Sequence, residues 1–342
     1  MKFTDIRVFT IFVLFILVGA IAWRLWTGRV ESPAVPQALP VLPMQGDILQ
    51  PILPLAPIPD LDPLRVALGE RLFHDSRLSA DFSLACASCH NLAKGGVDGR
   101  RVSVGIRGAL GGINAPSVLN SGYSIAQFWD GRAASLEEQA AGPIQNPIEM
   151  GATLPQVMGR LEQDKGLMAE FKRAYADGLT EANLFNALAT FERSLVTVNS
   201  RFDRFLRGEK QILTAIEIEG YRRFRELGCA SCHQGALVGG NMYQKFGVLG
   251  DYFATRPTTP ADLGRYSVTQ REEDRHVFKV PSLRNVALTA PYFHDGSAET
   301  LEQAVSVMAR YQLGRDLSTE DVGRLVAFLK TLTGELPTVA AQ

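Results

Sequence analysis

The stretch Cys86-Ala87-Ser88-Cys89-His90 guides the interpretation of the whole chain, and it is repeated letter for letter as Cys229-Ala230-Ser231-Cys232-His233. A C-x-x-C-H run is typical of a covalent c-type haem site. Each thiol can add to one vinyl group of the porphyrin, and the histidine that follows can bind the iron as proximal ligand. The sequence therefore predicts two covalently bound haem c groups, one held by Cys86, Cys89 and His90 and the other by Cys229, Cys232 and His233.

The competing interpretation of the cysteines is a zinc site or disulfides. Paired C-x-x-C sequences can bind one zinc ion with four thiolates, and C-x-x-C also occurs in thiol-redox sites. The two motifs use all four cysteines of the chain. Neither alternative explains why a histidine directly follows each pair, so we favour haem.

Length and charge set broad limits on the organisation of the chain. The chain has 342 residues, which suits about two domains of ordinary size, with one haem motif in each. The formal net charge is −1, which gives no sign of nucleic acid or of a strongly charged partner. We therefore expect no nucleic-acid binding.

The N-terminal residues differ from the rest of the chain. Val8 to Trp23 carries no charge and follows Lys2 and Arg7, which favours a transmembrane anchor whose basic end stays in the cytoplasm. The alternative is a cleaved signal peptide, because Ala20-Ile21-Ala22 resembles a cleavage site. In both cases the body of the protein is exported. We expect it in the periplasm, held at the inner membrane by the anchor.

Beyond the anchor, prolines are concentrated between Ser32 and Pro63, which excludes helix and predicts an extended linker. Helical periodicity follows in residues 64–73, 154–206 and 301–329, whereas residues 95–122 and 235–280 are rich in glycine and predict long irregular loops. We predict a mainly α fold with two cytochrome c-like haem domains. The predicted segments are an anchor or signal at 1–27, a linker at 28–63, an N-terminal domain at 64–208 and a C-terminal domain at 209–336.

Two local patterns support an internal repeat and place helix ends. Gly69-x-x-x-Phe73 recurs as Gly220-x-x-x-Phe224, each time just before a haem motif, where the glycine lets a second helix cross closely and the phenylalanine packs beside the porphyrin. Capping sequences predict three helix starts, at Ser135-x-x-Glu138, Thr214-x-x-Glu217 and Ser318-x-x-Asp321. The first of these helices is expected to end at Gly142-Pro143.

From about Leu64 to Gly334, the chain resembles the bacterial di-haem cytochrome c peroxidases. Their relatives include the di-haem enzyme that matures a tryptophan-derived quinone cofactor in a partner protein. Besides the two haem motifs, the matching runs are Asn114-Ala115-Pro116-Ser117, Phe128-Trp129-Asp130-Gly131-Arg132, Glu138-Gln139-Ala140, Pro147-Ile148-Glu149-Met150, Pro281-Ser282-Leu283-Arg284-Asn285, Pro291-Tyr292-Phe293-His294-Asp295-Gly296, and Met308 with Gln312.

The resemblance implies a peroxide-reacting centre at the first haem, on His90. Glu149 matches the acid–base carboxylate of the family and Gln139 matches its neighbour in the pocket. Splitting the O–O bond needs a group that takes a proton from one oxygen and returns it to the other, and a carboxylate can do both. Without the resemblance, Glu149 would be interpreted as a surface carboxylate.

The resemblance implies an electron-entry centre at the second haem, on His233. Met308 matches its axial ligand, and a thioether ligand raises the haem potential. Met242 is the alternative ligand, because it follows His233 closely, and Met308 also suits ordinary helix packing. Trp129 matches a tryptophan between the haems, although a buried tryptophan is more often a core residue.

A calcium site between the domains is a further implication of the resemblance. Asn114, with the backbone carbonyls of Thr289 and Pro291, matches the residues that hold this ion. One amide side chain with carbonyls and waters makes a sparse calcium site. Members of the family are commonly dimers, so a homodimer is also expected, although the sequence shows no interface.

The chain departs from the family pattern after the first haem motif. Typical members carry a distal histidine after Ser-Ile-Gly, whereas this chain has Ser103-Val104-Gly105-Ile106, and isoleucine cannot bind iron. Our hypothesis is that the first iron has no sixth protein ligand and reacts with peroxide in the all-ferric state, with Met150 or a water as the alternative ligand. The quinone-maturing relative also lacks the distal histidine, but it uses a tyrosine where this chain has Met308.

Three functions follow from these features. The leading one is an oxidoreductase that reduces hydrogen peroxide to water with electrons from a small cytochrome c or copper protein, or from quinol. The second is peroxide-dependent oxidation of residues on a partner protein through a high-valent di-haem state. The third is a membrane-tethered electron carrier, which would have two six-coordinate irons and no role for Glu149.

Overall fold

The computed structural model describes residues 50–58, 60–254 and 256–337. The predicted anchor and most of the predicted linker lie outside these residues. Within the described ranges, no helix is both long enough and apolar enough to cross a membrane.

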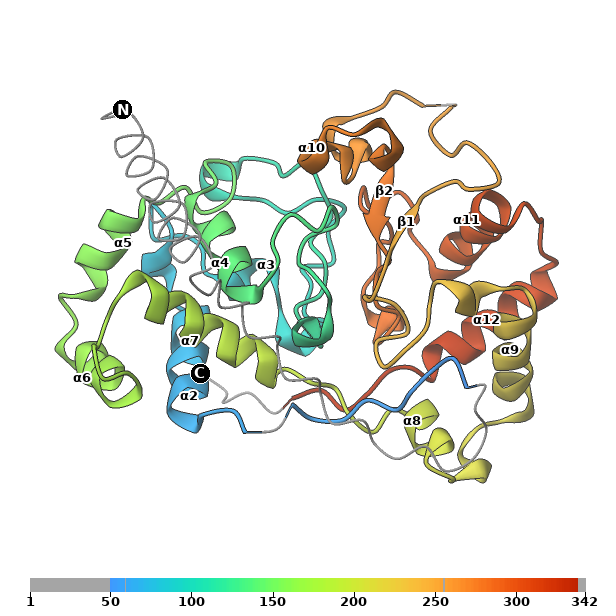
Figure 1. Ribbon diagram of the computed structural model, residues 1–342, viewed down its shortest axis with the longest axis horizontal. Coiled ribbons are helices and arrows are strands. Elements are labelled where there is room, and N and C mark those ends of the chain that lie inside the picture. The colour runs from blue at the N-terminus through green and yellow to red at the C-terminus, as the bar shows by residue number, and fades with distance from the viewer. Residues whose placement is uncertain (1–49, 59, 255, 338–342) are drawn as a thin grey trace, which may run out of the picture. The chain divides into compact units, whose positions relative to one another are not determined.

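The first half of the described chain is helical, as predicted (Figure 1). Its helices are α2 (Pro63–Phe73), α3 (Cys86–Cys89), α4 (Leu136–Gln145), α5 (Leu154–Leu161), α6 (Lys165–Ala174) and α7 (Glu181–Ser194). Five of them start at a residue whose side-chain oxygen accepts a backbone N–H of the first turn, namely Asp62, Ser135, Thr153, Asp164 and Thr180. One side of α7, which includes Leu184, Leu188 and Phe191, packs in the core of this half.

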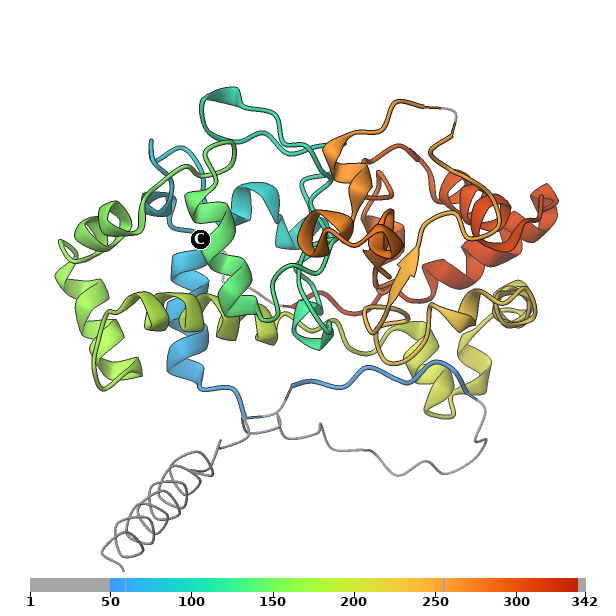
Figure 2. The ribbon, with the colours of Figure 1, turned by 45° about the horizontal axis from the view of Figure 1, so that its top comes forward.

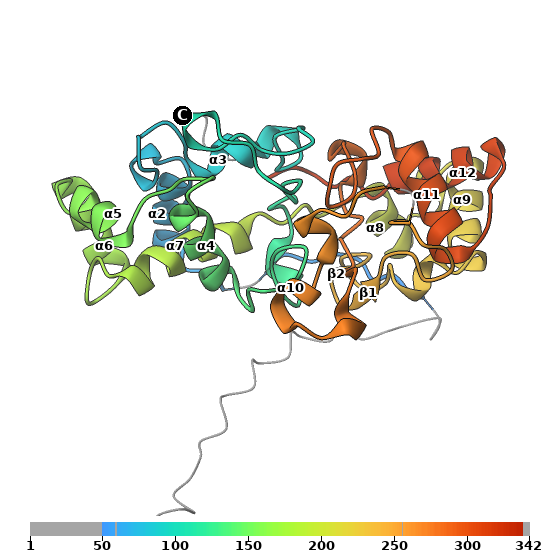
Figure 3. The same cartoon turned by 90° about the horizontal axis from the view of Figure 1, so that it is seen from above.

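The second half contains α8 (Arg201–Leu206), α9 (Ala215–Glu226), β1 (Tyr243–Lys245), α10 (Tyr266–Thr269), β2 (Val277–Lys279), α11 (Leu301–Leu313) and α12 (Thr319–Lys330). Its core is formed around Phe202, Phe224 and Phe328. β1 and β2 are antiparallel partners in a two-stranded sheet. This sheet lies beside residues 124–131 of the first half, since the Lys279 N–H donates to the Trp129 carbonyl at 2.8 Å (Figure 3).

Close helix crossings confirm the predicted role of the repeated glycines. A Cβ atom on Gly69 would lie 2.0 Å from the Ala187 carbonyl oxygen, and one on Gly220 would lie 2.0 Å from that of Arg324. α2 therefore crosses α7 and α9 crosses α12 at distances that only glycine allows. Both halves of the fold therefore contain a close helix crossing at a glycine.

The prediction that Gly142-Pro143 ends a helix is wrong, because α4 continues to Gln145. Proline has no N–H and so cannot donate to the carbonyl of the preceding turn. Only one backbone hydrogen bond is lost, near the end of the helix. The Asn146 N–H still donates to the Gly142 carbonyl at 3.0 Å. The predicted starts at Ser135 and Ser318 are confirmed.

The predicted domain boundary at residue 208 differs from the division of the two cores. The side chains of Phe202, Phe205 and Leu206 on α8 pack in the second core, whereas Leu195 packs in the first. The cores therefore divide between residues 195 and 202.

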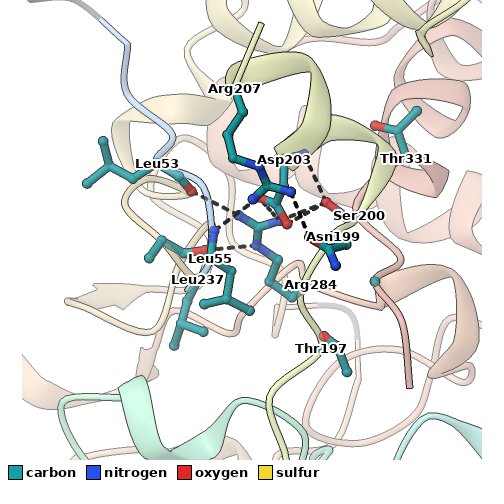
Figure 4. A network of polar contacts seen from close by, with 12 residues as sticks. Leu53, Leu55, Thr197, Asn199, Ser200, Asp203, Arg207, Leu237, Arg284 and Thr331 are labelled. Carbon is teal, nitrogen blue, oxygen red and sulfur yellow. Dashed lines mark hydrogen bonds and ion pairs between the residues drawn. The ribbon is translucent and has the colours of Figure 1, made fainter. Parts of the chain in front are cut away.

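A buried ion pair explains why α8 belongs to the second half (Figure 4). Arg284 and Asp203, both with fully buried side chains, form an ion pair of 2.8 Å. Arg284 also donates to the carbonyls of Ala236 and Leu53, and Asp203 accepts from the Leu55 N–H. Because a buried charge is tolerated only when it is paired and hydrogen-bonded, these contacts hold α8 and residues 53–55 against the second half.

Both ends of the described chain connect the halves (Figures 1 and 2). Ile52 is buried in the second core and forms a bridge with Gly235, after which the chain enters α2 of the first half. Beyond α12, the Glu335 N–H donates to the Val198 carbonyl at 2.8 Å. The halves are thus joined by chain segments as well as by side-chain packing.

Candidate haem sites

The first C-x-x-C-H motif forms a single helical turn, α3, and His90 directly follows its last residue. The His90 N–H donates to the Cys86 carbonyl at 3.0 Å, and the ring Nδ1 lies 3.2 Å from the Gly96 carbonyl oxygen. Burial lowers the pKa of His90, so the imidazole is neutral. An Nδ1–H bond to a carbonyl leaves Nε2 free as a metal ligand, which is the usual arrangement for a proximal histidine.

The second motif repeats this geometry. The His233 N–H donates to the Cys229 carbonyl at 3.0 Å, and the ring Nδ1 lies 3.3 Å from the Val238 carbonyl oxygen. Burial lowers the pKa of His233 to about 4. Both histidines are therefore neutral and oriented in the same way.

The cysteines do not suit a shared zinc site. No disulfide joins any two of them. Cys86 packs against the first core and Cys229 against the second, and burial raises their pKa values to about 12 and about 11. In the described part of the chain, the one group of three potential metal ligands contains no cysteine. Separate pairs of neutral thiols, each with an oriented imidazole, fit two covalent haem groups instead.

A cavity of about 320 Å³ surrounds the second motif. Cys229, Cys232, His233 and Met308 line it, with apolar residues of α11 around the methionine. The alternative ligand Met242 does not line this cavity. The thioether of Met308 thus faces the same space as the proximal histidine.

Glu149 lies close to the first motif. Its charge contributes, after burial, to a raised pKa of the Cys89 thiol. Burial raises the pKa of Glu149 itself, while the Asn146 side-chain amide opposes this by donating to the carboxylate at 2.7 Å. Gln139 is half-buried on α4 of the same half. A carboxyl group with a raised pKa is suited to exchange protons near neutral pH.

Ile106, at the position where the resemblance places a distal histidine, is only 5% exposed. Its backbone N–H donates to the Glu149 carbonyl at 2.8 Å, so the loop is attached to the segment that carries the carboxylate. His74 caps the end of α2, and His276 stacks on Phe253 of the second half at 4.0 Å. Neither histidine belongs to the loop that carries Ile106.

Trp129 lies where the two halves meet. Its indole N–H donates to the Asn114 carbonyl at 2.9 Å, and its ring packs edge-on to His294 at 6.3 Å. Trp129 also lines the cavity of the second motif. The predicted calcium residues Asn114, Thr289 and Pro291 line this cavity as well.

The sequence did not predict a buried polar cluster beside Trp129. Asp262 and His294 are 2.7 Å apart, and Arg256 pairs with both Asp262 and Asp295. The family-like run around His294 and the Asp262-Leu263-Gly264-Arg265 run were visible, but nothing in their spacing predicts that they meet. Arg256 pairs with both carboxylates and balances one of their two charges. The hydrogen bonds within the cluster make it a support for the Trp129 region.

Glu192 is a second residue that the sequence did not single out. It is 7% exposed on α7, and its charge raises the pKa of Cys86, so it lies near the first motif. Burial raises the pKa of Glu192 to about 8. The folded protein thus holds a proton that the unfolded chain loses at the ordinary glutamate pKa of about 4.3.

Because folded Glu192 keeps this proton, we predict a loss of stability as the pH rises from about 5 to about 8. The folded state binds more protons in this window, so the free energy of unfolding falls as the pH rises. Glu192→Gln should remove up to about 1.4 kcal/mol of this fall per pH unit. Denaturant unfolding at pH 5.5 and 7.5 measures it, with the exposed Glu181→Gln on α7 as control. Equal slopes for Glu192→Gln and the parent would contradict the prediction.

Comparison with known proteins agrees with these sites. Residues 63–211 match the di-haem cytochrome c peroxidase family. The chain is 47% identical to cytochrome c551 peroxidase of Nitrosomonas europaea over 292 residues, which is 84% of this chain and 85% of the relative. It is 48% identical to cytochrome c peroxidase Ccp of Escherichia coli over 285 residues, 82% of this chain, and it spans 61% of that relative's length.

The fold is also similar to a solved structure of a MauG-like protein associated with microbial copper homeostasis. The TM-score is 0.73 at 30% sequence identity, and the match covers 86% of this chain and 96% of that chain. Two haem motifs with the same local geometry, the matched fold and the high identity over most of the described residues lead to one conclusion. The chain belongs to the di-haem cytochrome c peroxidase family, a family of oxidoreductases.

Proposed function

We propose that the protein reduces hydrogen peroxide to water at the first haem, with electrons that enter at the second haem from a small cytochrome c or copper protein. The observation that carries this proposal is the different surroundings of two identical motifs. Glu149, an acid–base group, lies close to Cys89. Met308, a thioether, shares the cavity of Cys229 and His233. Family membership adds haem c as the cofactor and a redox partner as electron source.

Cys86, Cys89 and His90 would hold haem c at the first site, and the haem would supply the electrons that reduce the O–O bond of peroxide. The carboxylate of Glu149 takes the proton from one peroxide oxygen and returns it to the departing oxygen. Asn146, which donates to Glu149 at 2.7 Å, keeps the carboxylate oriented. Gln139 is the proposed neighbour of the peroxide in this pocket.

Trp129 is the proposed electron path between the two haems. Support comes from its position, because the ring lines the second cavity while its indole N–H is held by Asn114 of the first half. An aromatic ring that spans two redox centres shortens the distance that each electron must cross.

The first iron is proposed to react in the all-ferric state. Ile106, which offers no ligand atom, is buried in the loop tied to Glu149. We expect a low-temperature EPR spectrum of the oxidised protein to show one high-spin and one low-spin ferric haem. Peroxide should react without prior reduction. Two low-spin signals would contradict this and would favour an electron carrier or a gated enzyme.

The matched variant is Ile106→His, which restores a ligand at this position. It is expected to convert the first haem to low spin and to make the peroxide reaction depend on prior reduction. Ile106→Leu serves as its control and should remain high spin.

Peroxide-dependent oxidation of a partner protein is the alternative function. The same spectra would fit it, because the absence of a ligand at position 106 also suits that function. Fast turnover with a reduced small cytochrome favours peroxide reduction, whereas an oxidised state that decays only with one partner favours the alternative.

The remaining parts of the proposal concern ions, location and assembly. Calcium is proposed at Asn114 with the carbonyls of Thr289 and Pro291, and elemental analysis of the purified protein tests it. Export to the periplasm is proposed because haem attachment through paired thiols occurs on that side of the membrane. Carbonate extraction of membranes distinguishes an inner-membrane anchor from a cleaved signal, and light scattering tests the homodimer.

A further inference from the structure

The wall of the second cavity carries basic side chains but no acidic ones among the described residues that line it. Its lysine and arginine residues are Lys245, Lys279 and Arg284. The nearby Asp262 and Asp295 share Arg256 as a partner, and neither carboxylate lines the cavity. The cavity is therefore suited to a ligand that carries negative charge.

The three basic residues are not equivalent. Arg284 forms a buried ion pair with Asp203 at 2.8 Å and also donates to several carbonyls, so its charge is already balanced (Figure 4). Lys245 is exposed to solvent, which balances its charge. Lys279 remains. Its ammonium has one hydrogen bond, to the Ser124 hydroxyl at 3.4 Å, and no carboxylate of the described chain pairs with it.

Lys279 is half-buried, and its surroundings affect its charge. Removal from water lowers the pKa of Lys279 to about 8, with no opposing contribution from a carboxylate. Partial removal of an ammonium from water without a nearby anion is unfavourable. In the described chain the residue is thus a cation that lacks its counter-ion.

The backbone of Lys279 is fixed. The residue ends β2, is paired in register with Tyr243 of β1, and donates its N–H to the Trp129 carbonyl at 2.8 Å. The backbone that carries this side chain is therefore held in the cavity wall, beside Trp129.

We propose that Lys279 binds a propionate of the haem attached through Cys229 and Cys232 and thereby raises the reduction potential of that haem. The inference rests on the proposed function in one respect, namely that the second motif holds an electron-accepting haem. Haem c brings two carboxylates into the cavity, and one of them can be the anion that Lys279 lacks. A cation beside the propionate favours the reduced haem, because reduction adds negative charge. Lys279 thus acts in the same direction as the thioether of Met308.

The test is a spectroelectrochemical titration of the purified holoprotein and of Lys279→Met. The variant should shift the reduction equilibrium of the second haem about tenfold toward the oxidised form, which corresponds to about 59 mV for a one-electron couple. The first haem should keep its potential, and Lys279→Arg should retain the parent potential because it keeps the charge. Lys245→Met is the matched control, since it removes an exposed lysine from the same cavity and sheet.

Three outcomes would overturn the proposal. These are an unchanged second potential in Lys279→Met, a shift as large in Lys245→Met, and a shift of the first haem alone, which would assign the lysine to the other cofactor. If Lys279→Met loses the second haem, the haem content of Lys279→Arg and Lys279→Gln decides whether the proposal holds. Retention in Lys279→Arg with loss in Lys279→Gln supports the ion pair, whereas loss in both means that the lysine is needed only for packing. Peroxide turnover is measured separately, so a failure of the proposed function is distinguishable from a failure of this inference.

Discussion

Glu149→Gln is expected to lower kcat/KM for hydrogen peroxide by about 10² to 10⁴-fold. Glutamine keeps the size of the side chain and can still be hydrogen-bonded by Asn146, but it cannot take a proton from peroxide. The spectra and the potential of the second haem should be unchanged, because Met308 and His233 line a cavity that Glu149 does not line. Steady-state kinetics with a reduced small cytochrome measures the loss.

The control for this variant is Glu162→Gln, an exposed carboxylate of the same half. It should retain the parent activity. If Glu149→Gln also retained it, Glu149 would be no more than a partly buried carboxylate, and another group would have to move the proton.

The pH dependence of the same reaction gives an independent measure of Glu149. The base form is required, so kcat/KM should rise as the pH increases through the pKa of Glu149. Burial raises this pKa, which moves the acidic limb above the ordinary glutamate range. Asn146 opposes this shift by donating to the carboxylate, so Asn146→Ala should move the limb to still higher pH. If the acidic limb of kcat/KM did not move in Asn146→Ala, the titration of a different group would be its cause.

Met308→His is expected to produce the second large effect, on the second haem. Replacing a thioether by an imidazole lowers the haem potential, on the order of tenths of a volt within the roughly 0.8 V that axial ligands span. Electron entry from a mild donor should then fail, although the first haem should still react with peroxide. A redox titration and stopped-flow mixing with peroxide separate these two results.

Met242→Leu is the matched variant for this experiment. Met242 does not line the cavity of the second motif, so its removal should leave the potential unchanged. If Met242→Leu lowered the potential and Met308→His did not, the axial ligand would have been assigned to the wrong methionine.

Features that depend on neighbouring residues could be predicted from the sequence. The haem motifs are local, because thiols three positions apart and the next histidine already have the spacing that one haem needs. Helix starts at Ser135 and Ser318 were predicted correctly for the same reason, since the capping bond joins residues within one turn. The glycine of the repeated Gly-x-x-x-Phe run indicated a close crossing, although the sequence does not say which helix crosses it.

Features that depend on residues far apart in the chain were decided by the tertiary structure. α8 packs in the second half because Asp203 meets Arg284, and α4 continues past Pro143. The counter-ion that Lys279 lacks and the buried proton of Glu192 are likewise invisible in the sequence. The physical reason is that burial and charge balance depend on every group packed around a side chain, and most of those groups come from distant parts of the chain.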